Sequence, residues 1–213
     1  MKGVLVSMIN EKRRFYSFTL VELLLVIGII ALLAVLLMPS LGKARNKAKE
    51  VVCLSNIKQI GINTLIYAND YSGWGPLFVS APVWHLTLSN GGYLNPSNTL
   101  VCPSWNPFKW DVSLTNYMRY TYGNNRTLAP DLIGRMTSRT RPSTDAYFSD
   151  TISRIADSSL GLQYYYFKPK FSSAEACVHL RHSKGANMFF LDGHVLNVKA
   201  KSLEEFDITD FLY

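Results

Sequence analysis

The first strong pattern in the chain is an apolar run from Phe18 to Met38 that carries one charged residue, Glu22. A helix rises about 1.5 Å per residue, so this run is long enough to cross the roughly 30 Å hydrocarbon core of a bilayer. A carboxylate in such a segment is costly to bury unpaired and marks a candidate functional position. The pattern predicts a membrane-spanning helix over 18–38 with Glu22 near its start.

A second, amphipathic pattern follows Pro39, which is expected to kink the helix because proline removes a backbone donor and crowds the preceding turn. Apolar residues recur at spacings of three and four as far as Asp70, which predicts that the helix continues over 39–70. Glu50 and Lys58 are expected on its exposed surface. The expected core-facing positions are Ala44, Ala48, Val51, Leu54, Ile57, Gly61, Leu65 and Ala68.

From Tyr71 onward, short apolar or aromatic pieces alternate with turn residues, which predicts a β-rich head over 71–213. The segment 123–125, Gly-Asn-Asn, is expected to form a turn, and 202–206 a short terminal helix. The fold class is therefore α+β, with the long N-terminal helix packed on a small antiparallel sheet. The candidate strands are 117–122, 146–149 and 162–167.

The clearest local element lies near the C-terminus, where Asp192-Gly193 separates two apolar runs, 186–191 and 194–198. Asp-Gly between apolar runs is a strong hairpin signal, because a type I′ turn needs positive φ at both central positions. We expect a C-terminal β-hairpin with a type I′ turn.

The N-terminal residues also resemble a known signal. Basic residues at 12–14 precede Ser-Phe-Thr-Leu-Val-Glu and the apolar run, and this combination resembles the prepilin signal of type IV pilins and type II secretion pseudopilins. The resemblance implies that 1–17 is a leader, that prepilin peptidase cleaves between Ser17 and Phe18, and that the new amino group of Phe18 is methylated. Ser17 stands where the family has Gly. A pilin-like fold is implied, with Pro39 at the family's helix-distorting proline.

The resemblance also supplies a partner for Glu22. In a filament of packed helices, its carboxylate would pair with the amino group of Phe18 on a neighbouring subunit, and a paired charge is tolerable where a lone one is not. The implied location is a single span of the inner membrane with a periplasmic head, and a periplasmic or extracellular filament after assembly. The alternative is an ordinary secretory signal or anchor, although such a signal ends in small residues that this run lacks.

A second resemblance involves His182, which is followed after nine residues by Asp192-Gly193. This spacing is similar to a signature that closes a group of pilin-like proteins. The blocks 53–61 and 102–103 also resemble that group. The signature indicates lineage more than mechanism.

The same region contains four candidate metal ligands, because His-x-x-His followed by Asp-x-His invites a zinc or calcium site. They are His179, His182, Asp192 and His194. The structural alternative is favoured: Asp192 serves the turn, and His182 bonds the hairpin backbone or the Asp192 carboxylate. No cofactor is expected, with calcium as the alternative. Asp145 and Asp150 are expected to be solvated carboxylates at strand ends.

The chain has three cysteines, Cys53, Cys102 and Cys177. In a periplasmic domain two of them would pair, and Cys53 on the helix and Cys102 in a Cys-Pro-Ser turn are the expected partners. Three buried free thiols are the alternative.

Composition and motifs exclude few further classes of function. The net charge is +7, but four basic residues lie in the leader, so no nucleic-acid partner is inferred. No nucleophile, zinc-protease or phosphate-loop motif is present, and no enzyme is expected. The sequence predicts a structural subunit of a type IV pilus-like filament or a type II secretion pseudopilus. Its expected partners are prepilin peptidase, like subunits, other pilins, the membrane and the inner-membrane assembly platform.

Two alternatives stay open. A minor pilin would use an aromatic head surface to bind DNA or polysaccharide, and a membrane-anchored metal-binding enzyme would use the His and Asp residues. The aromatic candidates are Trp74, Trp84, Trp105 and Trp110.

Overall fold

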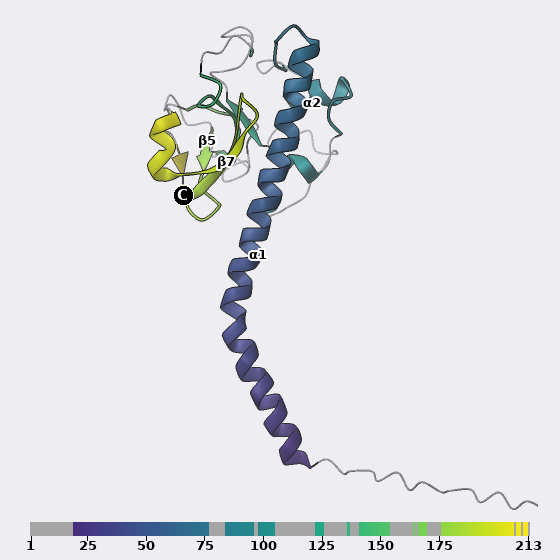
Figure 1. Cartoon of the computed structure of the whole chain (residues 1–213), viewed down its shortest axis with the longest axis vertical. Helices are drawn as coiled ribbons and strands as arrows, with labels where there is room; N and C mark the ends of the chain where they lie inside the picture. Colours follow the sequence, from purple (N-terminus) through teal and green to yellow (C-terminus); the bar gives the residue numbers. More distant parts are fainter. Residues whose placement is uncertain are drawn as a thin grey trace, which may run out of the picture. The chain divides into compact units, whose positions relative to one another are not determined.

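The N-terminal patterns form one continuous helix, α1 (Leu20–Asp70), in the computed structural model (Figure 1). The predicted end at Asp70 is confirmed, and Pro39 lies inside the helix without ending it. The structure divides into two compact units, Met1–Lys43 and Ala44–Tyr213, and α1 contributes to both. The described residues are 19–76, 84–95, 98–104, 122–125, 136, 141–153, 164, 166–169, 176–206, 208–209 and 211–212.

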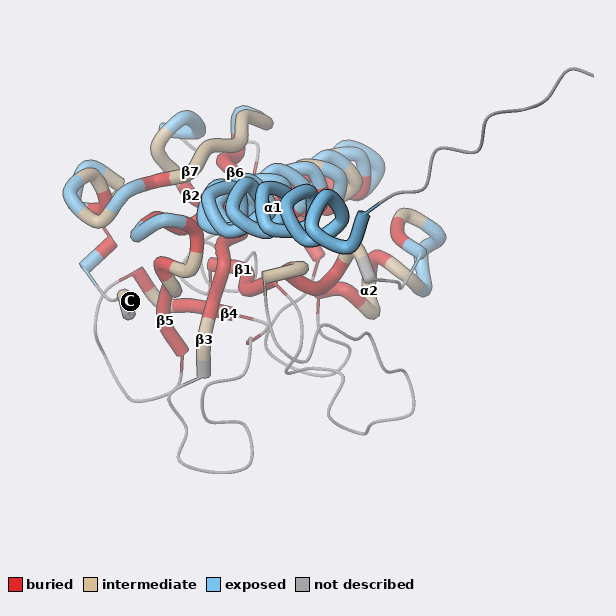
Figure 2. The backbone as a smooth tube through the Cα atoms, turned by 90° about the horizontal axis from the view of Figure 1, so that it is seen from below, coloured by how far each residue is buried: buried red, intermediate tan, exposed pale blue. Residues whose placement is uncertain are grey.

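The first unit contains the apolar part of α1. All its described residues, from Thr19 to Lys43, are exposed, as the tube in Figure 2 shows for the N-terminal part of this helix. Among the residues that the structure describes, α1 is the one helix long and apolar enough to cross a membrane. Apolar side chains that no described part of the chain covers need another apolar environment. This segment of α1 could therefore span a bilayer.

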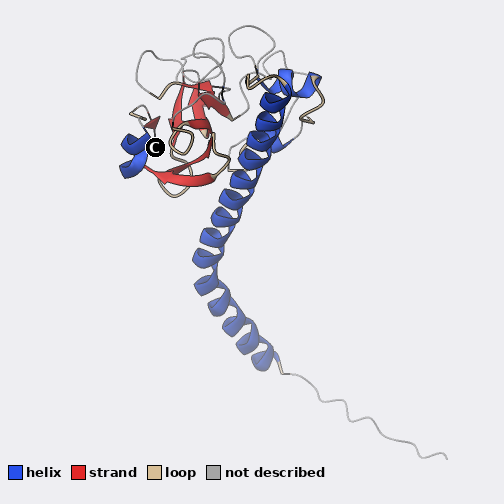
Figure 3. Ribbon diagram, turned by 45° about the horizontal axis from the view of Figure 1, so that its top comes forward, coloured by secondary structure: helices blue, strands red, loops and turns tan. Residues whose placement is uncertain are grey.

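The second unit contains two sheets, drawn in red in Figure 3. Their strand orders are β4-β1-β2-β6-β7 and β3-β5-β8. The β1–β4 and β5–β8 pairs are parallel and the others are antiparallel. The strands are β1 (Gly123–Asn125), β2 (Ala146–Ser149), β3 (Thr151–Ser153), β4 (Tyr166–Phe167), β5 (Ala176–His179), β6 (Gly185–Phe190), β7 (Val195–Lys199) and β8 (Phe211–Leu212).

The α+β class is thus confirmed, but the prediction of an antiparallel sheet is wrong because both sheets are mixed. The parallel pairs join strands that are distant in the sequence, and parallel pairing needs long connections rather than hairpins. Three short helices complete the described elements: α2 (Trp84–Asn90), η1 (Asn98–Leu100) and η5 (Ala200–Phe206). The last of these is the predicted terminal helix, formed as a 3₁₀-helix.

Strand β6 separates two hydrophobic cores because its side chains alternate between the faces of the sheet. Phe189 belongs to the core that includes Cys53, Ile57 and Ile60 of α1. Met188 and Phe190 belong to the opposite core, which is closed by residues from β7, η5 and the C-terminal segment. At the contact of α1 with β6, a Cβ atom on Gly61 would lie 2.2 Å from the ring of Phe189. Only glycine allows this close approach.

The buried face of α1 differs from the predicted stripe. Ala44, Ala48 and Val51 are exposed, whereas Glu50 is buried and pairs with Lys47 at 2.6 Å, so its predicted surface position is wrong. The prediction counted apolar and small residues only, but polar side chains such as Glu50, Asn56 and Thr64 also face the head. The buried set is Glu50, Cys53, Asn56, Ile57, Ile60, Gly61, Thr64, Tyr67 and Ala68.

The strand predictions have mixed outcomes. The prediction of 146–149 is confirmed as β2, while 123–125 is a strand and not a turn. It pairs on both sides, and the Asn125 side chain donates to the carbonyl of Ala146 at 2.9 Å. Of the candidate 162–167, the structure describes a strand at Tyr166–Phe167. The candidate 117–122 lies outside the described residues except for Tyr122.

The predicted C-terminal hairpin is confirmed as β6 and β7, but its turn is not type I′. Gly193 has a φ of 91°, and Asp192 is not among the residues with positive φ, so the loop has three residues with one left-handed glycine. The double positive φ occurs instead between β5 and β6, at Ser183 and Lys184 (52° and 60°). His182 and Gly185 exchange both backbone hydrogen bonds across that turn.

Candidate functional site

Glu22 lies in the first turn of α1 and is bonded within its own chain. Its carboxylate accepts hydrogen bonds from the backbone N–H and the hydroxyl of Thr19, at 2.9 and 2.7 Å, and the Thr19 hydroxyl accepts from the Glu22 N–H at 3.2 Å. This reciprocal arrangement is a capping box, which satisfies free N–H groups at a helix start. Ser17 and Phe18, the predicted cleavage residues, lie outside the described residues.

The capping box gives Glu22 a local role besides the predicted pairing with a neighbouring subunit. The pattern Thr-x-x-Glu before an apolar run is a known signal for a helix start, and the prediction for Glu22 did not take it into account. A neutral glutamine could also cap the helix, so capping explains a polar residue at 22 better than it explains a charge.

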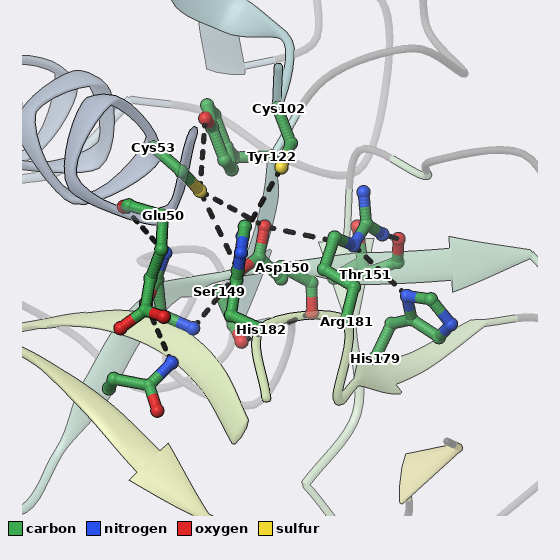
Figure 4. A network of polar contacts seen from close by, with 12 residues as sticks. Glu50, Cys53, Cys102, Tyr122, Ser149, Asp150, Thr151, His179, Arg181 and His182 are labelled. Atoms are coloured by element: carbon green, nitrogen blue, oxygen red, sulfur yellow. Dashed lines mark hydrogen bonds and ion pairs between the residues drawn. The ribbon is translucent and has the colours of Figure 1, made fainter. Parts of the chain in front are cut away.

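A second candidate site is a buried polar cluster in the head, made by Cys53, Cys102, Asp150 and His182 (Figure 4). One ligand-type atom from each residue lies within 4.8 Å of the other three. Cys53 comes from α1, Cys102 follows η1, Asp150 follows β2, and His182 lies in the turn after β5. The fold thus brings together four segments that are far apart in the sequence.

Asp150 lies where the chain passes from one sheet to the other, between β2 and β3. Its N–H donates to the carbonyl of Asn187 on β6, and its own carbonyl accepts from His179 on β5. These backbone bonds hold the carboxylate toward α1. The prediction that Asp150 is solvated is wrong, because its side chain is completely buried.

The contacts within the cluster are short. The Cys53 sulfur lies 3.4 Å from Oδ1 of Asp150, and the Cys102 sulfur lies 3.3 Å from Nε2 of His182. The same Nε2 lies 3.4 Å from Oδ2 of Asp150. The hydroxyl of Tyr122 donates to the Cys53 sulfur at 3.3 Å. The four side chains therefore converge on one small volume.

Charged and polar neighbours surround the cluster. Nε of Arg181 lies 3.9 Å from Oδ1 of Asp150, and this arginine side chain also donates to the carbonyl of Thr151 and to Nδ1 of His179. The N–H of Asn187 donates to Oδ2 of Asp150 at 2.9 Å. The buried carboxylate thus has both a cation and a backbone donor.

Burial and these neighbours shift the pKa values of Cys102, Asp150 and His182. Burial alone would raise the pKa of the Cys102 thiol, but hydrogen bonds with Cys53 and His182 and the charge of Arg181 lower it. Burial, followed by the nearby Cys102, raises the pKa of Asp150. Burial opposes a charge on His182, yet its contact with Cys102 and the charge of Asp150 outweigh burial and raise its pKa. These pKa shifts favour the thiolate form of Cys102 and the charged form of His182 relative to the free side chains.

The other predicted metal candidates lie apart from this cluster. His179 accepts from Arg181, and burial lowers its pKa to about 4. Asp192 and His194 pair with each other in the hairpin loop. The predicted contact of His182 with the Asp192 carboxylate is therefore wrong, since β6 lies between them and His182 pairs with Asp150.

Both ends of the signature that runs from His182 to Asp192-Gly193 contact α1. His182 meets Cys53 of α1 in the buried cluster, and the carbonyl of Gly193 accepts a hydrogen bond from Lys58 of α1. The nine residues between them cover the turn and β6. Both ends of the signature thus hold the sheet against the same helix.

Cys53 and Cys102, the predicted disulfide partners, lie in one cluster as thiols without a disulfide bond, and Cys177 is a third buried thiol. Of the tryptophans proposed for a binding surface, Trp84 is buried in the core, while Trp74 is 42% exposed. Trp105 and Trp110 lie outside the described residues. Comparison of the chain with protein-family models, curated proteins and solved structures finds no match.

Proposed function

We propose that this chain is a structural subunit of a type IV pilus-like filament or type II secretion pseudopilus, anchored and assembled through the apolar part of α1. The observation that carries the proposal is the exposure of that segment. Its leucine, isoleucine and valine side chains are about half exposed or more along the whole run. A bilayer before assembly and neighbouring helices after assembly would each cover them.

Glu22 gives the segment its direction and register in this proposal. Cleavage before Phe18 places a free amino group four residues from the carboxylate. In the filament the carboxylate of one subunit pairs with the amine of the next, which fixes the axial position of each helix. The proposed partners are prepilin peptidase, the inner-membrane assembly platform and like subunits, with the head in the periplasm. The proposal gives the chain no catalytic activity.

The aromatic-surface alternative is weaker than the filament proposal. It relied on four tryptophans, and one of the two described, Trp84, is a fully buried core residue that packs on Phe148. Of the two described tryptophans, only Trp74 is therefore exposed enough to contribute to an aromatic binding face.

The N-terminus of the protein isolated from its own cells tests the processing step. We expect mass spectrometry of the N-terminal peptide to show a chain that begins at Phe18 and carries one added methyl group. Chains that retain residues 1–17, or that are cut after the apolar run, would contradict the proposal, because either product lacks the free amine beside Glu22.

A further inference from the structure

We propose that Cys53, Cys102, Asp150 and His182 bind one zinc ion that locks the head onto α1. The donor set is two sulfurs, one imidazole nitrogen and one carboxylate oxygen, and zinc accepts all three types in closed tetrahedral sites. The four residues lie on separate segments, so one ion would cross-link α1, the loop after η1, the end of β2 and the turn after β5. This site is independent of the proposed filament function.

Three of the ligand-atom distances in the cluster fit a tetrahedral site, and the four atoms all lie within 4.8 Å of one another. With zinc bonds of about 2.0–2.3 Å, neighbouring ligand atoms of a tetrahedral site lie about 3.3–3.8 Å apart. The Cys102 sulfur lies 3.3 Å from Nε2 of His182, and Oδ2 of Asp150 lies 3.4 Å from the same Nε2 and 3.7 Å from the Cys53 sulfur. Small shifts of the side chains would suffice to admit an ion.

The arrangement of His182 argues against a nucleophile with a relay. In a Cys-His-Asp relay, the thiol and the carboxylate bond different nitrogens of the histidine ring. One nitrogen accepts the proton of the thiol, and the carboxylate bonds the other and so orients the ring. Here Cys102 and Asp150 both approach Nε2 of His182. Convergence on a single ring nitrogen is what a shared metal ion requires. All four residues are also buried.

The charges balance with zinc in place. Two thiolates and one carboxylate carry three negative charges, and the ion supplies two positive charges. Arg181, whose side chain is 5% exposed and lies 3.9 Å from Asp150, supplies the third.

Outer donors support the ligands in the way that metal sites need. The Tyr122 hydroxyl donates to the Cys53 sulfur, and the Asn187 N–H donates to the Asp150 carboxylate. Both would stabilise negative charge on a ligand atom. Ser183 and Lys184, with their positive φ values, form the tight turn that positions His182.

A polar cavity of about 320 Å³ leads to the cluster and offers a route for the ion. Lys49, Glu50, Arg181 and His182 are among the residues that line it. The cavity thus reaches the cluster at His182, while Cys53, Cys102 and Asp150 lie fully buried behind it. A site of this kind also needs a route to exchange metal.

The proposal competes with the predicted disulfide, because Cys53 and Cys102 cannot both ligate zinc and bond to each other. The full chain, purified in detergent without reductant or chelator, separates the two. We expect one zinc per chain by elemental analysis after gel filtration, and three thiols that react on unfolding with chelator. A Cys53–Cys102 disulfide by peptide mapping, or no bound metal after incubation with zinc, would overturn the proposal.

Variants and a cobalt probe locate the ion. Exchange with Co²⁺ should give the intense visible bands of tetrahedral coordination and a thiolate charge-transfer band. We expect Cys102→Ser and His182→Gln to lose stoichiometric metal, while Cys177→Ser and His194→Gln, which alter a cysteine and a histidine outside the cluster, retain it. Chelator should lower the Tm of wild type but not of His182→Gln. Equal metal content in wild type and His182→Gln would contradict the assignment.

Discussion

We expect the Glu22→Gln variant to insert into the membrane as wild type does and to form no filaments. Glutamine can still bond to Thr19 and cap α1, but it removes the charge that would pair with the amine of a neighbouring Phe18. An amine left unpaired in an apolar contact costs about 3–5 kcal/mol, or roughly 100-fold or more in each subunit contact. The amount of subunit in the sheared filament fraction, relative to the membrane fraction, measures the effect.

Thr19→Ala is the matched control. It removes the hydroxyl from the capping box and keeps the charge of Glu22, at a cost of about 1 kcal/mol in helix stability. We expect this variant to assemble. If Glu22→Gln assembles normally and Thr19→Ala does not, Glu22 acts as a cap and the assembly role is wrong.

The second large effect concerns the contact between Gly61 and Phe189. We expect Phe189→Ala to lower the free energy of unfolding by about 3–5 kcal/mol, because a fully buried ring leaves a cavity between α1 and β6. Gly61→Ala should destabilise wild type by about 1–3 kcal/mol, since its Cβ would overlap the ring. In the Phe189→Ala background that clash is absent, and Gly61→Ala should become neutral or stabilising.

Urea unfolding of the full chain in detergent measures this reversal of sign. Gly42→Ala is the control, because a Cβ at Gly42 meets nothing within 4 Å and should have the same small effect in both backgrounds. A Gly61→Ala effect that does not change between the two backgrounds would show that α1 does not pack on β6 through this contact.

The sequence predicted the elements that local patterns encode. Periodicity and turn residues predicted the length of α1 and its end at Asp70. They also predicted strand β2 and the hairpin of β6 and β7. The local sequence did not predict the type of turn at Asp192-Gly193, because hydrogen bonds to distant parts of the chain decide which residue takes the left-handed conformation. The parallel pairing of β1 with β4 could not be predicted from the sequence either, since long-range packing brings these two strands together.

The buried cluster was predictable in part only. Cys53 and Cys102 were candidates as a disulfide pair, and His182 was a candidate for other reasons and with other partners. Asp150 was expected in solvent because a carboxylate at a strand end is usually solvated. Its burial results from the crossing between two sheets, where its backbone bonds both β5 and β6. No local pattern in the sequence encodes such a crossing.

Covalent capture of the contact between Glu22 and Phe18 tests the central claim most directly. A lipid-soluble carbodiimide joins a carboxylate to a nearby amine as an amide, with loss of water, and adds no spacer. In filaments, we predict covalent dimers in which Glu22 of one chain is joined to the N-terminal nitrogen of Phe18 of another, as mapped by mass spectrometry. Monomers alone, with Glu22 linked only within its own chain or not at all, would contradict assembly through this pair.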